Sequence, residues 1–136
     1  MTNGATRVIE TQGLAKTYGD VQALKGINLS VPGHSITGFL GPNGAGKSTT
    51  IKLLLGLIQP TAGSGTIFGI DITRESTAIR RRVGYLPQHP TFDPNRTARE
   101  TLGFAARFFT DDTHRIKTRV DASLSLVGLQ DKADRL

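Results

Sequence analysis

The chain contains no cysteine, which excludes a disulfide framework and a thiolate metal site and is compatible with a reducing cytosol. No apolar run is long enough to span a bilayer, and residues 1–4 lack the charged-then-apolar pattern of a secretory signal. The three histidines, His34, His89 and His114, lie far apart without metal-ligand spacing, so we assign them no role. We therefore expect any membrane association to be peripheral.

Acidic residues are fewer than basic residues: the chain has 11 Asp and Glu and 17 Lys and Arg, which gives a net charge of +6. Such an excess can indicate nucleic acid or an anionic membrane surface as a partner. The excess is spread along the chain, however, and only Arg80, Arg81 and Arg82 form a run. We interpret this run as a solvated helix end rather than a nucleic-acid patch. The 136 residues suffice for one domain with one core.

Residues 41–48 fit the pattern G-x-x-x-x-G-K-[ST] of a phosphate-binding loop. Glycines in such a loop let backbone N–H groups turn toward phosphate oxygens. Lys47 supplies a positive charge for the β- and γ-phosphates, and the Ser48 hydroxyl can ligate magnesium. The residues of the loop are Gly41, Pro42, Asn43, Gly44, Ala45, Gly46, Lys47 and Ser48. The alternative is a plain glycine-rich turn between a strand and a helix.

The flanking sequence favours the phosphate-binding interpretation. Residues 36–40 form a short apolar run that predicts a buried parallel strand before the loop. A helix is predicted after the loop, with its N-terminus toward the anion and with Gly56 as its end. Its predicted buried face consists of Ile51, Leu54, Leu55 and Ile58.

Further strands are predicted over residues 7–14, 27–31, 66–68 and 83–86, with a turn at residues 18–20. A short helix is predicted over residues 73–81. Two more helices are predicted after a polar loop at 88–96. The first has a capping box of Thr97 and Glu100, and its apolar face consists of Leu102, Ala105, Ala106 and Phe109. The second is capped by Asp111 or Asp112 and ends at Gly128, and its apolar stripe consists of Ile116, Val120, Leu124 and Val127. This order of elements indicates an α/β fold with a helical appendage.

Three segments resemble the nucleotide-binding domain of ABC transporters. They are residues 41–49, residues 17–19 with 24–31, and residues 83–88. The resemblance covers residues 7–136 and is closest to ATP-binding subunits of bacterial-type exporters whose permease is a separate chain. It implies that Thr49 belongs to the nucleotide site with the loop, that Tyr18 stacks on adenine, and that Gln88 contacts magnesium or a water near the γ-phosphate.

The resemblance also implies a fold and partners. The expected fold is a P-loop NTPase-type core with peripheral antiparallel strands, spanning residues 7–90 after a loose terminus at 1–6, followed by part of a helical subdomain at 91–136. The implied ligands are ATP and Mg²⁺. The implied partners are a transmembrane permease, which would carry the substrate selectivity, and a second ATP-binding subunit in a homodimer. The expected location is the cytoplasmic face of the membrane, and nucleic acid is not an expected partner.

Two segments of that family do not occur in these 136 residues: the signature Leu-Ser-Gly-Gly-Gln and the Walker B strand ending in Asp-Glu. The resemblance therefore implies the N-terminal half of such a domain, truncated before both segments, with no complete catalytic set, weak hydrolysis and a poorly stabilised central sheet. Asp71 ends an apolar run, but Ile72 follows it instead of an acid, so we expect Asp71 to cap a turn.

Other interpretations remain open. A soluble ABC-type ATPase acting on nucleic acid or ribosomes would account for the positive charge, and a nucleotide-binding fragment without hydrolysis would account for the missing segments. Phe104, Phe108 and Phe109 could face a docking helix of a partner, as the resemblance implies, or could belong to the core, where aromatic residues at helical spacing are more often found.

Overall fold

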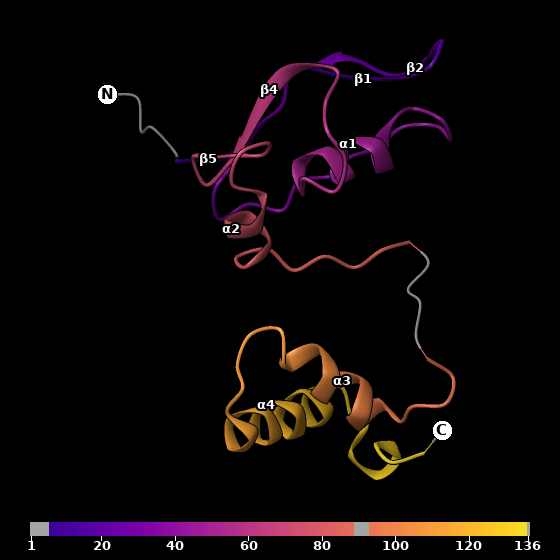
Figure 1. The fold of residues 1–136 in the computed structure, drawn as a ribbon, viewed down its shortest axis with the longest axis vertical. Helices are drawn as coiled ribbons and strands as arrows, with labels where there is room; N and C mark the ends of the chain where they lie inside the picture. The colour runs from indigo at the N-terminus through magenta and orange to yellow at the C-terminus, as the bar shows by residue number, and fades with distance from the viewer. Residues whose placement is uncertain (1–5, 89–92, 136) are drawn as a thin grey trace. The chain divides into compact units, whose positions relative to one another are not determined.

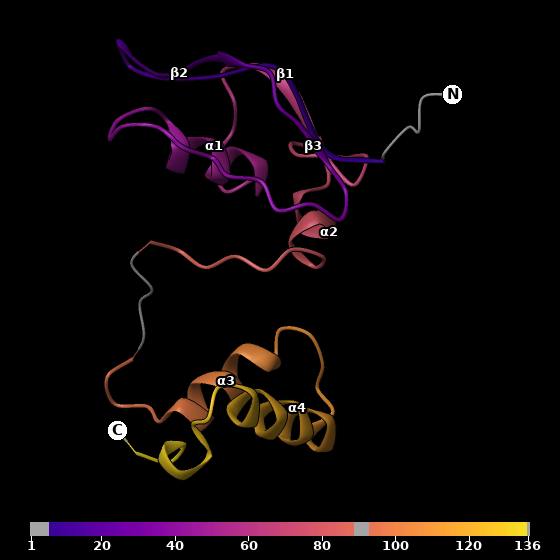
Figure 2. The ribbon, with the colours of Figure 1, turned by 180° about the vertical axis from the view of Figure 1, so that it is seen from behind.

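The computed structural model describes residues 6–88 and 93–135, and Figures 1 and 2 show it from two sides. The chain divides into two compact units, Met1–Gly84 and Tyr85–Leu136. The predicted loose terminus, apart from Thr6, and His89 lie outside the described residues. In the described part of the chain, no helix is both long and apolar enough to cross a membrane.

The first unit is built on an antiparallel sheet. Its strands are β1 (Arg7–Tyr18), β2 (Val21–Ile27), β3 (Ser30–Pro32), β4 (Ala62–Ile67) and β5 (Ile70–Asp71). They are arranged in the order β2-β1-β4-β5, with β3 also paired to β1. The predicted peripheral antiparallel strands are thus present. The first strand extends beyond the predicted residue 14, because its second half pairs with β2 from Leu14 opposite Ile27 to Tyr18 opposite Val21.

The predicted strand over residues 27–31 is wrong, since two strands meet there. The buried Thr11 interrupts the pairing: its Oγ1 donates to the carbonyl of Ile27 at 3.0 Å and accepts from the N–H of Leu29 at 2.8 Å. The side chain of Asn28 accepts a further bond from the N–H of Gly13 at 2.7 Å. These side-chain bonds link β1 to the residues that connect β2 to β3, where the regular pairing is interrupted, as Asn and Thr side chains commonly do.

Helix α1 (Lys47–Leu54) follows the glycine-rich loop and ends as predicted, because Gly56 takes a left-handed φ of 62° just after it. Of the predicted buried face, Leu54 and Leu55 are buried and Ile58 packs against the core, but Ile51 is exposed. Thr50 and Leu53, which were not predicted, are also buried. The core of this unit consists of Leu14, Leu24, Leu53, Leu54, Ile67, Ile72 and Ile79. It fills the space between the sheet and α1.

Two predicted strands, residues 36–40 and 83–86, are not formed. Ile36, Leu40 and Leu86 are almost fully exposed. A buried parallel strand requires a neighbour on which its N–H and C=O groups can bond. In the part of the chain that the structure describes, neither segment pairs with another strand. Both segments therefore follow an irregular course, and most of their apolar side chains are exposed, although Val83 is partly buried against the core.

The short helix α2 (Ser76–Arg80) is fixed to the end of α1. A Cβ built on Gly56 would lie 2.2 Å from the Cβ of Ser76, so only glycine permits this approach. The guanidinium of Arg80 donates to the carbonyl of Leu55 at 3.0 Å and to Oγ1 of Thr77 at 3.1 Å. The basic run is exposed, as predicted, but Arg80 also satisfies a carbonyl at the C-terminus of α1.

The second unit contains α3 (Ala98–Ala106), α4 (Thr113–Leu126) and the 3₁₀ helix η1 (Gln130–Lys132). The predicted capping box of Thr97 and Glu100 is present. Of the two predicted caps for α4, Asp112 is the one that accepts a bond, from the N–H of Arg115 at 3.0 Å. Val127 is exposed, contrary to the predicted stripe. The core residues are Val120, Leu124 and Ala133, with Ala98, Leu102 and Ile116 packed against them.

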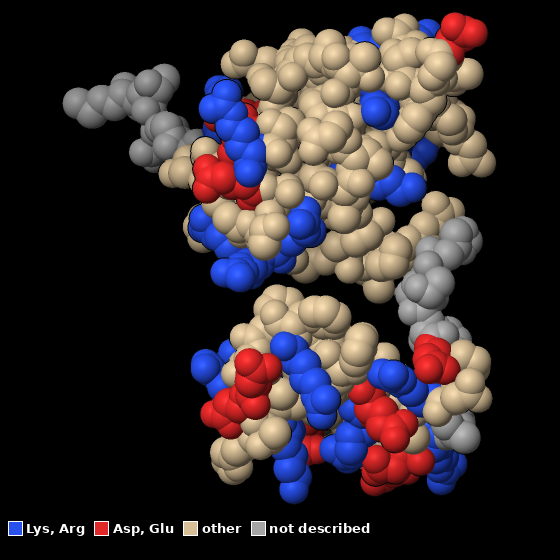
Figure 3. Space-filling view, viewed as in Figure 1, with Lys and Arg blue, Asp and Glu red and all other residues tan. Residues whose placement is uncertain are grey.

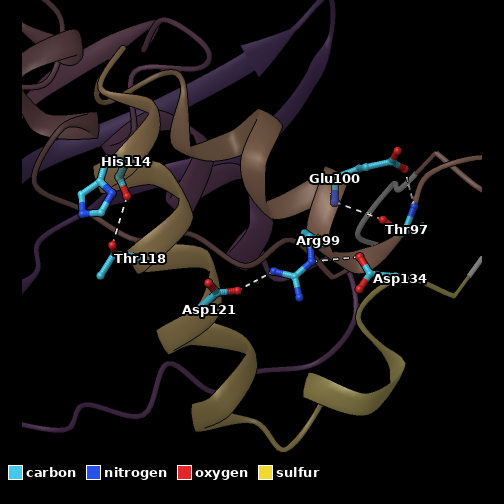
Figure 4. Close-up of polar contacts among 7 residues, drawn as sticks. All are labelled: Thr97, Arg99, Glu100, His114, Thr118, Asp121 and Asp134. Carbon is cyan, nitrogen blue, oxygen red and sulfur yellow. Dashed lines mark hydrogen bonds and ion pairs between the residues drawn. The ribbon is translucent and has the colours of Figure 1, made fainter.

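Arg99 holds the second unit together (Figure 4). Its guanidinium donates to Asp121 on α4 and, through Nε, to Asp134 at 2.8 Å. The backbone N–H of Arg99 donates to the carbonyl of Ala133 at 3.0 Å. The two carboxylates raise the pKa of Arg99 above its usual value, with Asp121 as the larger influence. One side chain thus joins α3, α4 and the segment after η1.

Candidate nucleotide-binding site

The glycine-rich loop takes the backbone conformation that its glycines permit. Gly44 and Gly46 have φ values of 82° and 84°, in the left-handed region that side chains disfavour. Gly46 is the N-cap of α1, and the first turn of the helix contains no acidic residue. The first N–H groups of a helix have no intrahelical acceptor, and they carry partial positive charge. The loop and helix therefore present donors suited to an anion.

Strand β2 supports the loop from one side. A Cβ built on Gly46 would lie 2.8 Å from the carbonyl oxygen of Ala23 and 2.9 Å from Cδ1 of Leu24. Such distances exclude any side chain unless the backbone moves. Leu24 is itself buried in the core of the unit. The end of the loop is thus fixed in position by direct packing against a strand of the sheet.

Lys47 is folded back over its own loop. Its Nζ donates to the carbonyl of Gly41 at 2.6 Å and to that of Pro42 at 2.7 Å. The loop is closed further by a bond from the N–H of Ala45 to the carbonyl of Pro42 at 3.2 Å. The ammonium group is therefore held by neutral oxygens, which a phosphate group would replace with charged and stronger acceptors.

Three hydroxyl residues follow the lysine, and they differ in how exposed they are. Ser48 is exposed and Thr49 is partly exposed, so both can be reached by a ligand. Thr50 is buried, and its Oγ1 donates to the carbonyl of Gly46 at 2.9 Å. Ser48 is thus the most exposed of the three hydroxyl residues at the start of α1. No group of three or more His, Cys, Asp or Glu suited to a metal occurs among residues 6–88 and 93–135.

Tyr18 stands at the end of β1, opposite Val21, where the turn of Gly19 and Asp20 joins β1 to β2. It is 49% exposed, and Nζ of Lys16 lies 5.0 Å from the centre of its ring. Figures 1 and 2 both show the tip of this hairpin and the glycine-rich loop on the same side of the first unit. The structure therefore brings the predicted aromatic residue and the predicted phosphate loop to one side.

Gln88 lies in an exposed, irregular segment of the second unit, and its predicted contact with magnesium or water stays a prediction. Asp71 is the last residue of β5, and its side chain caps the turn that follows, as expected from the sequence. Its Oδ1 accepts bonds from Oγ1 of Thr73 at 2.6 Å, from the N–H of Thr73 at 2.7 Å and from the N–H of Arg74 at 3.1 Å. The bonds from Thr73, followed by that from Arg74, lower the pKa of Asp71 below its usual value.

Sequence reasoning missed two parts of this site. The support from Ala23 and Leu24 has no local signal, because it depends on how α1 is placed against the sheet. Lys16 did have a signal: a cation two residues before the candidate aromatic residue, within the same predicted strand region.

Comparison with known proteins finds a matching family model and curated relatives. A family model described as ABC transporter matches residues 24–136. The daunorubicin/doxorubicin resistance ATP-binding protein DrrA of Streptomyces peucetius is 40% identical over 136 residues, which are 100% of this chain and 41% of that protein. The bacitracin transport ATP-binding protein BcrA of Bacillus licheniformis is 42% identical over 129 residues, 95% of this chain and 41% of that protein. The chain thus spans about two fifths of the length of these curated relatives.

Solved structures agree with the sequence relatives. A dimeric post-hydrolysis state of the ATP-binding cassette MJ0796 bound to ADP and Pi has a TM-score of 0.80 and 27% identity, and the match covers 93% of this chain and 60% of that one. A structure of an ATP-binding subunit of an ABC transporter has a TM-score of 0.78 and 28% identity, covering 93% and 53%. These neighbours support the predicted α/β P-loop NTPase fold.

Proposed function

The chain belongs to the ABC transporter family, and from this premise we propose that it supplies the nucleotide-binding residues of an ATP-binding subunit that drives export through a separate membrane permease. The observation that carries the proposal is the loop of residues 41–46 before α1, with its left-handed glycines and the lysine at its end. The curated relatives support export, since their names describe drug resistance, bacitracin transport and Nod factor export.

We assign the phosphates of ATP to the loop and to the first turn of α1. The glycine conformations turn N–H groups toward the ligand, and the Lys47 ammonium would leave the carbonyls of Gly41 and Pro42 for phosphate oxygens. The exposed Ser48 hydroxyl would hold Mg²⁺ together with nucleotide oxygens. Tyr18 would stack on the adenine. ATP itself supplies the phosphoanhydride bond whose hydrolysis drives transport.

Members of this family are ATPases, but hydrolysis needs a carboxylate near the magnesium and a group that orients the attacking water. Asp71 ends an apolar run in the sequence, as such a carboxylate would, but in the structure it lies in the two-residue strand β5. Its Oδ1 is occupied by Thr73 and Arg74, and it caps a turn. We therefore propose that this chain binds Mg-ATP and that it does not turn ATP over at the rate of a whole ATP-binding subunit.

The exposed aromatic residues of the second unit favour a protein partner. Phe104, Phe108 and Phe109 are exposed, so the interpretation that placed them in the core is wrong. The rings of Phe104 and Phe108 meet edge to face at 5.3 Å, and the Arg96 guanidinium lies 4.8 Å from the Phe104 ring. Phe104 also lines a groove of about 1190 Å³ between α3 and α4. We propose that this groove receives the permease.

The nucleic-acid alternative rests on charge alone. On the face of the second unit that Figure 3 shows, basic and acidic side chains are intermixed, and the groove between α3 and α4 likewise contains both signs. A surface that follows a phosphate backbone is expected to carry basic residues gathered on one face. Binding of RNA or DNA that falls steeply with added salt would favour this alternative. Co-purification with a permease would favour transport.

The test of nucleotide binding uses the purified chain with Mg-ATP in a calorimetric titration. We expect Lys47→Ala to weaken binding about 10- to 100-fold, because hydrogen bonds from a charged donor to phosphate contribute roughly 1.5–3 kcal/mol. Lys52→Ala is the matched control, since Lys52 is an exposed residue of the same helix and the charge change is the same.

The outcomes separate the two parts of the proposal. Equal affinity of the Lys47→Ala and wild-type chains, with both folded by circular dichroism, would contradict the assigned site. Turnover of ATP by this chain at the rate of a whole ATP-binding subunit, lost in Lys47→Ala, would contradict only the proposed lack of hydrolysis.

A further inference from the structure

Lys16 and Tyr18 form a pair at the end of β1, and the assigned nucleotide site gives a role to Tyr18 but none to Lys16. Nζ of Lys16 lies 5.0 Å from the centre of the Tyr18 ring, within the range of a cation–π interaction. Lys16 is partly buried, whereas Tyr18 is 49% exposed. One face of the ring is therefore covered by an ammonium group, and the exposed half of the residue remains open to a ligand.

This pair is connected to the phosphate loop through β2. Lys16 is opposite Leu24 in the pairing of β1 with β2, and Tyr18 is opposite Val21. Leu24 is one of the two residues that a Cβ on Gly46, at the end of the loop, would meet within 3 Å. The loop and the ring are therefore held by the same strand, and a nucleotide with its phosphates on the loop has a fixed support on which to place its base.

We propose that Lys16 is a positioning residue of the base site. It covers one face of the Tyr18 ring and restricts the ring, so that the base of a bound nucleotide stacks on the opposite face. The physical reason is that an exposed ring loses side-chain freedom when a ligand stacks on it, and a ring already restricted by Lys16 loses less. The inference rests on the proposed function, because it assumes a nucleotide whose base reaches Tyr18.

A positioning role differs measurably from a direct phosphate contact. If the Lys16 ammonium bound phosphate, its removal would weaken every polyphosphate ligand to a similar extent. If it acts through the ring, its removal weakens only ligands that carry a base. Mg-ATP and inorganic tripolyphosphate with Mg²⁺ are therefore the two probes, since both carry a triphosphate and only ATP carries a base.

The experiment compares the purified wild-type chain with Lys16→Met, which keeps an unbranched apolar stem. Exposed cation–π interactions are weak, so we expect the affinity for Mg-ATP to fall about two- to fivefold, with no change for tripolyphosphate. Lys16→Arg should keep the wild-type affinity. Lys25→Met, at an exposed position on β2, is the matched control for the lost charge and should leave both affinities unchanged.

Two further measurements test whether the effect runs through the ring. In a Tyr18→Ala background, Lys16→Met should have no additional effect on ATP binding. The chain has two tyrosines and no tryptophan, so a Tyr85→Phe background leaves Tyr18 as the only tyrosine emitter. In that background, Lys16→Met should change the Tyr18 fluorescence before nucleotide is added.

Each outcome has one meaning. Unchanged ATP affinity in Lys16→Met, or an equal loss for ATP and tripolyphosphate, would overturn the positioning role while the proposed function stands. A wild-type chain that is folded but binds neither ATP nor tripolyphosphate would overturn the proposed function, and this inference with it. Loss for ATP alone, absent in the Tyr18→Ala background, would support the proposal.

Discussion

Gly44 and Gly46 look alike in sequence but differ in what surrounds them. Both take a left-handed backbone conformation. A Cβ on Gly44 would meet no atom within 4 Å, whereas one on Gly46 would lie 2.8 Å from the carbonyl of Ala23. The motif requires the second glycine because of close packing with β2, while the first serves only the turn of the backbone. The pattern G-x-x-x-x-G-K-[ST] fixes Gly46 but leaves position 44 open, and it does not show that Gly46 is needed for packing against β2.

This difference predicts unequal effects of alanine at the two positions. Gly44→Ala should destabilise the chain by about 1 kcal/mol, the usual cost of a left-handed non-glycine residue. Gly46→Ala should cost more, about 2–4 kcal/mol, because the backbone must also move away from Ala23. Urea denaturation of both variants measures the difference in their free energies of unfolding. Titration with Mg-ATP should show the larger loss of affinity for Gly46→Ala. Equal destabilisation of the two variants would refute the packing explanation.

Among the helices and strands, those whose ends carry their own signals were predicted best. The capping box of Thr97 and Glu100 and the glycine after α1 act within a few residues of sequence, so the pattern alone is sufficient. Residues 36–40 and 83–86 have the apolar character of strands but form none. A strand depends on hydrogen bonds to a neighbour that is distant in sequence, and local composition carries no information about whether that neighbour is present.

The cap of α4 offers a test with a built-in control. Asp111 and Asp112 are adjacent and chemically identical, but only Asp112 accepts a described bond from the N-terminus of the helix, at Arg115. Asp112→Ala should destabilise the second unit by about 1 kcal/mol, the usual effect of losing an N-cap. Asp111→Ala removes the same charge near the same helix and should cost clearly less. Thermal unfolding followed by circular dichroism compares the two, and a larger effect at Asp111 would contradict the assigned cap.

At the scale of the whole molecule, the two units have separate hydrophobic cores that share no residue. The core around Leu53 holds the sheet, α1 and α2, which carry the phosphate loop and Tyr18. The core around Leu124 holds α3, α4 and the segment after η1, which carry the groove and the exposed phenylalanines. The residues proposed for ATP and those proposed for the permease thus depend on different packing. The length of the chain suggested one domain with a single core, because neither length nor composition shows how contacts between residues are divided along the chain.

Separate cores predict separate consequences of core mutations. Leu53→Ala and Leu124→Ala each remove a fully buried leucine and should cost about 2–5 kcal/mol, comparable to the whole stability of a unit this small. Leu124→Ala should therefore raise amide hydrogen exchange throughout α3 and α4, while β1, β4 and α1 keep wild-type exchange and the chain still binds Mg-ATP. Leu53→Ala should show the reverse pattern and lose ATP binding. Exchange that rises in both units in either variant would show that the two cores unfold as one cooperative structure.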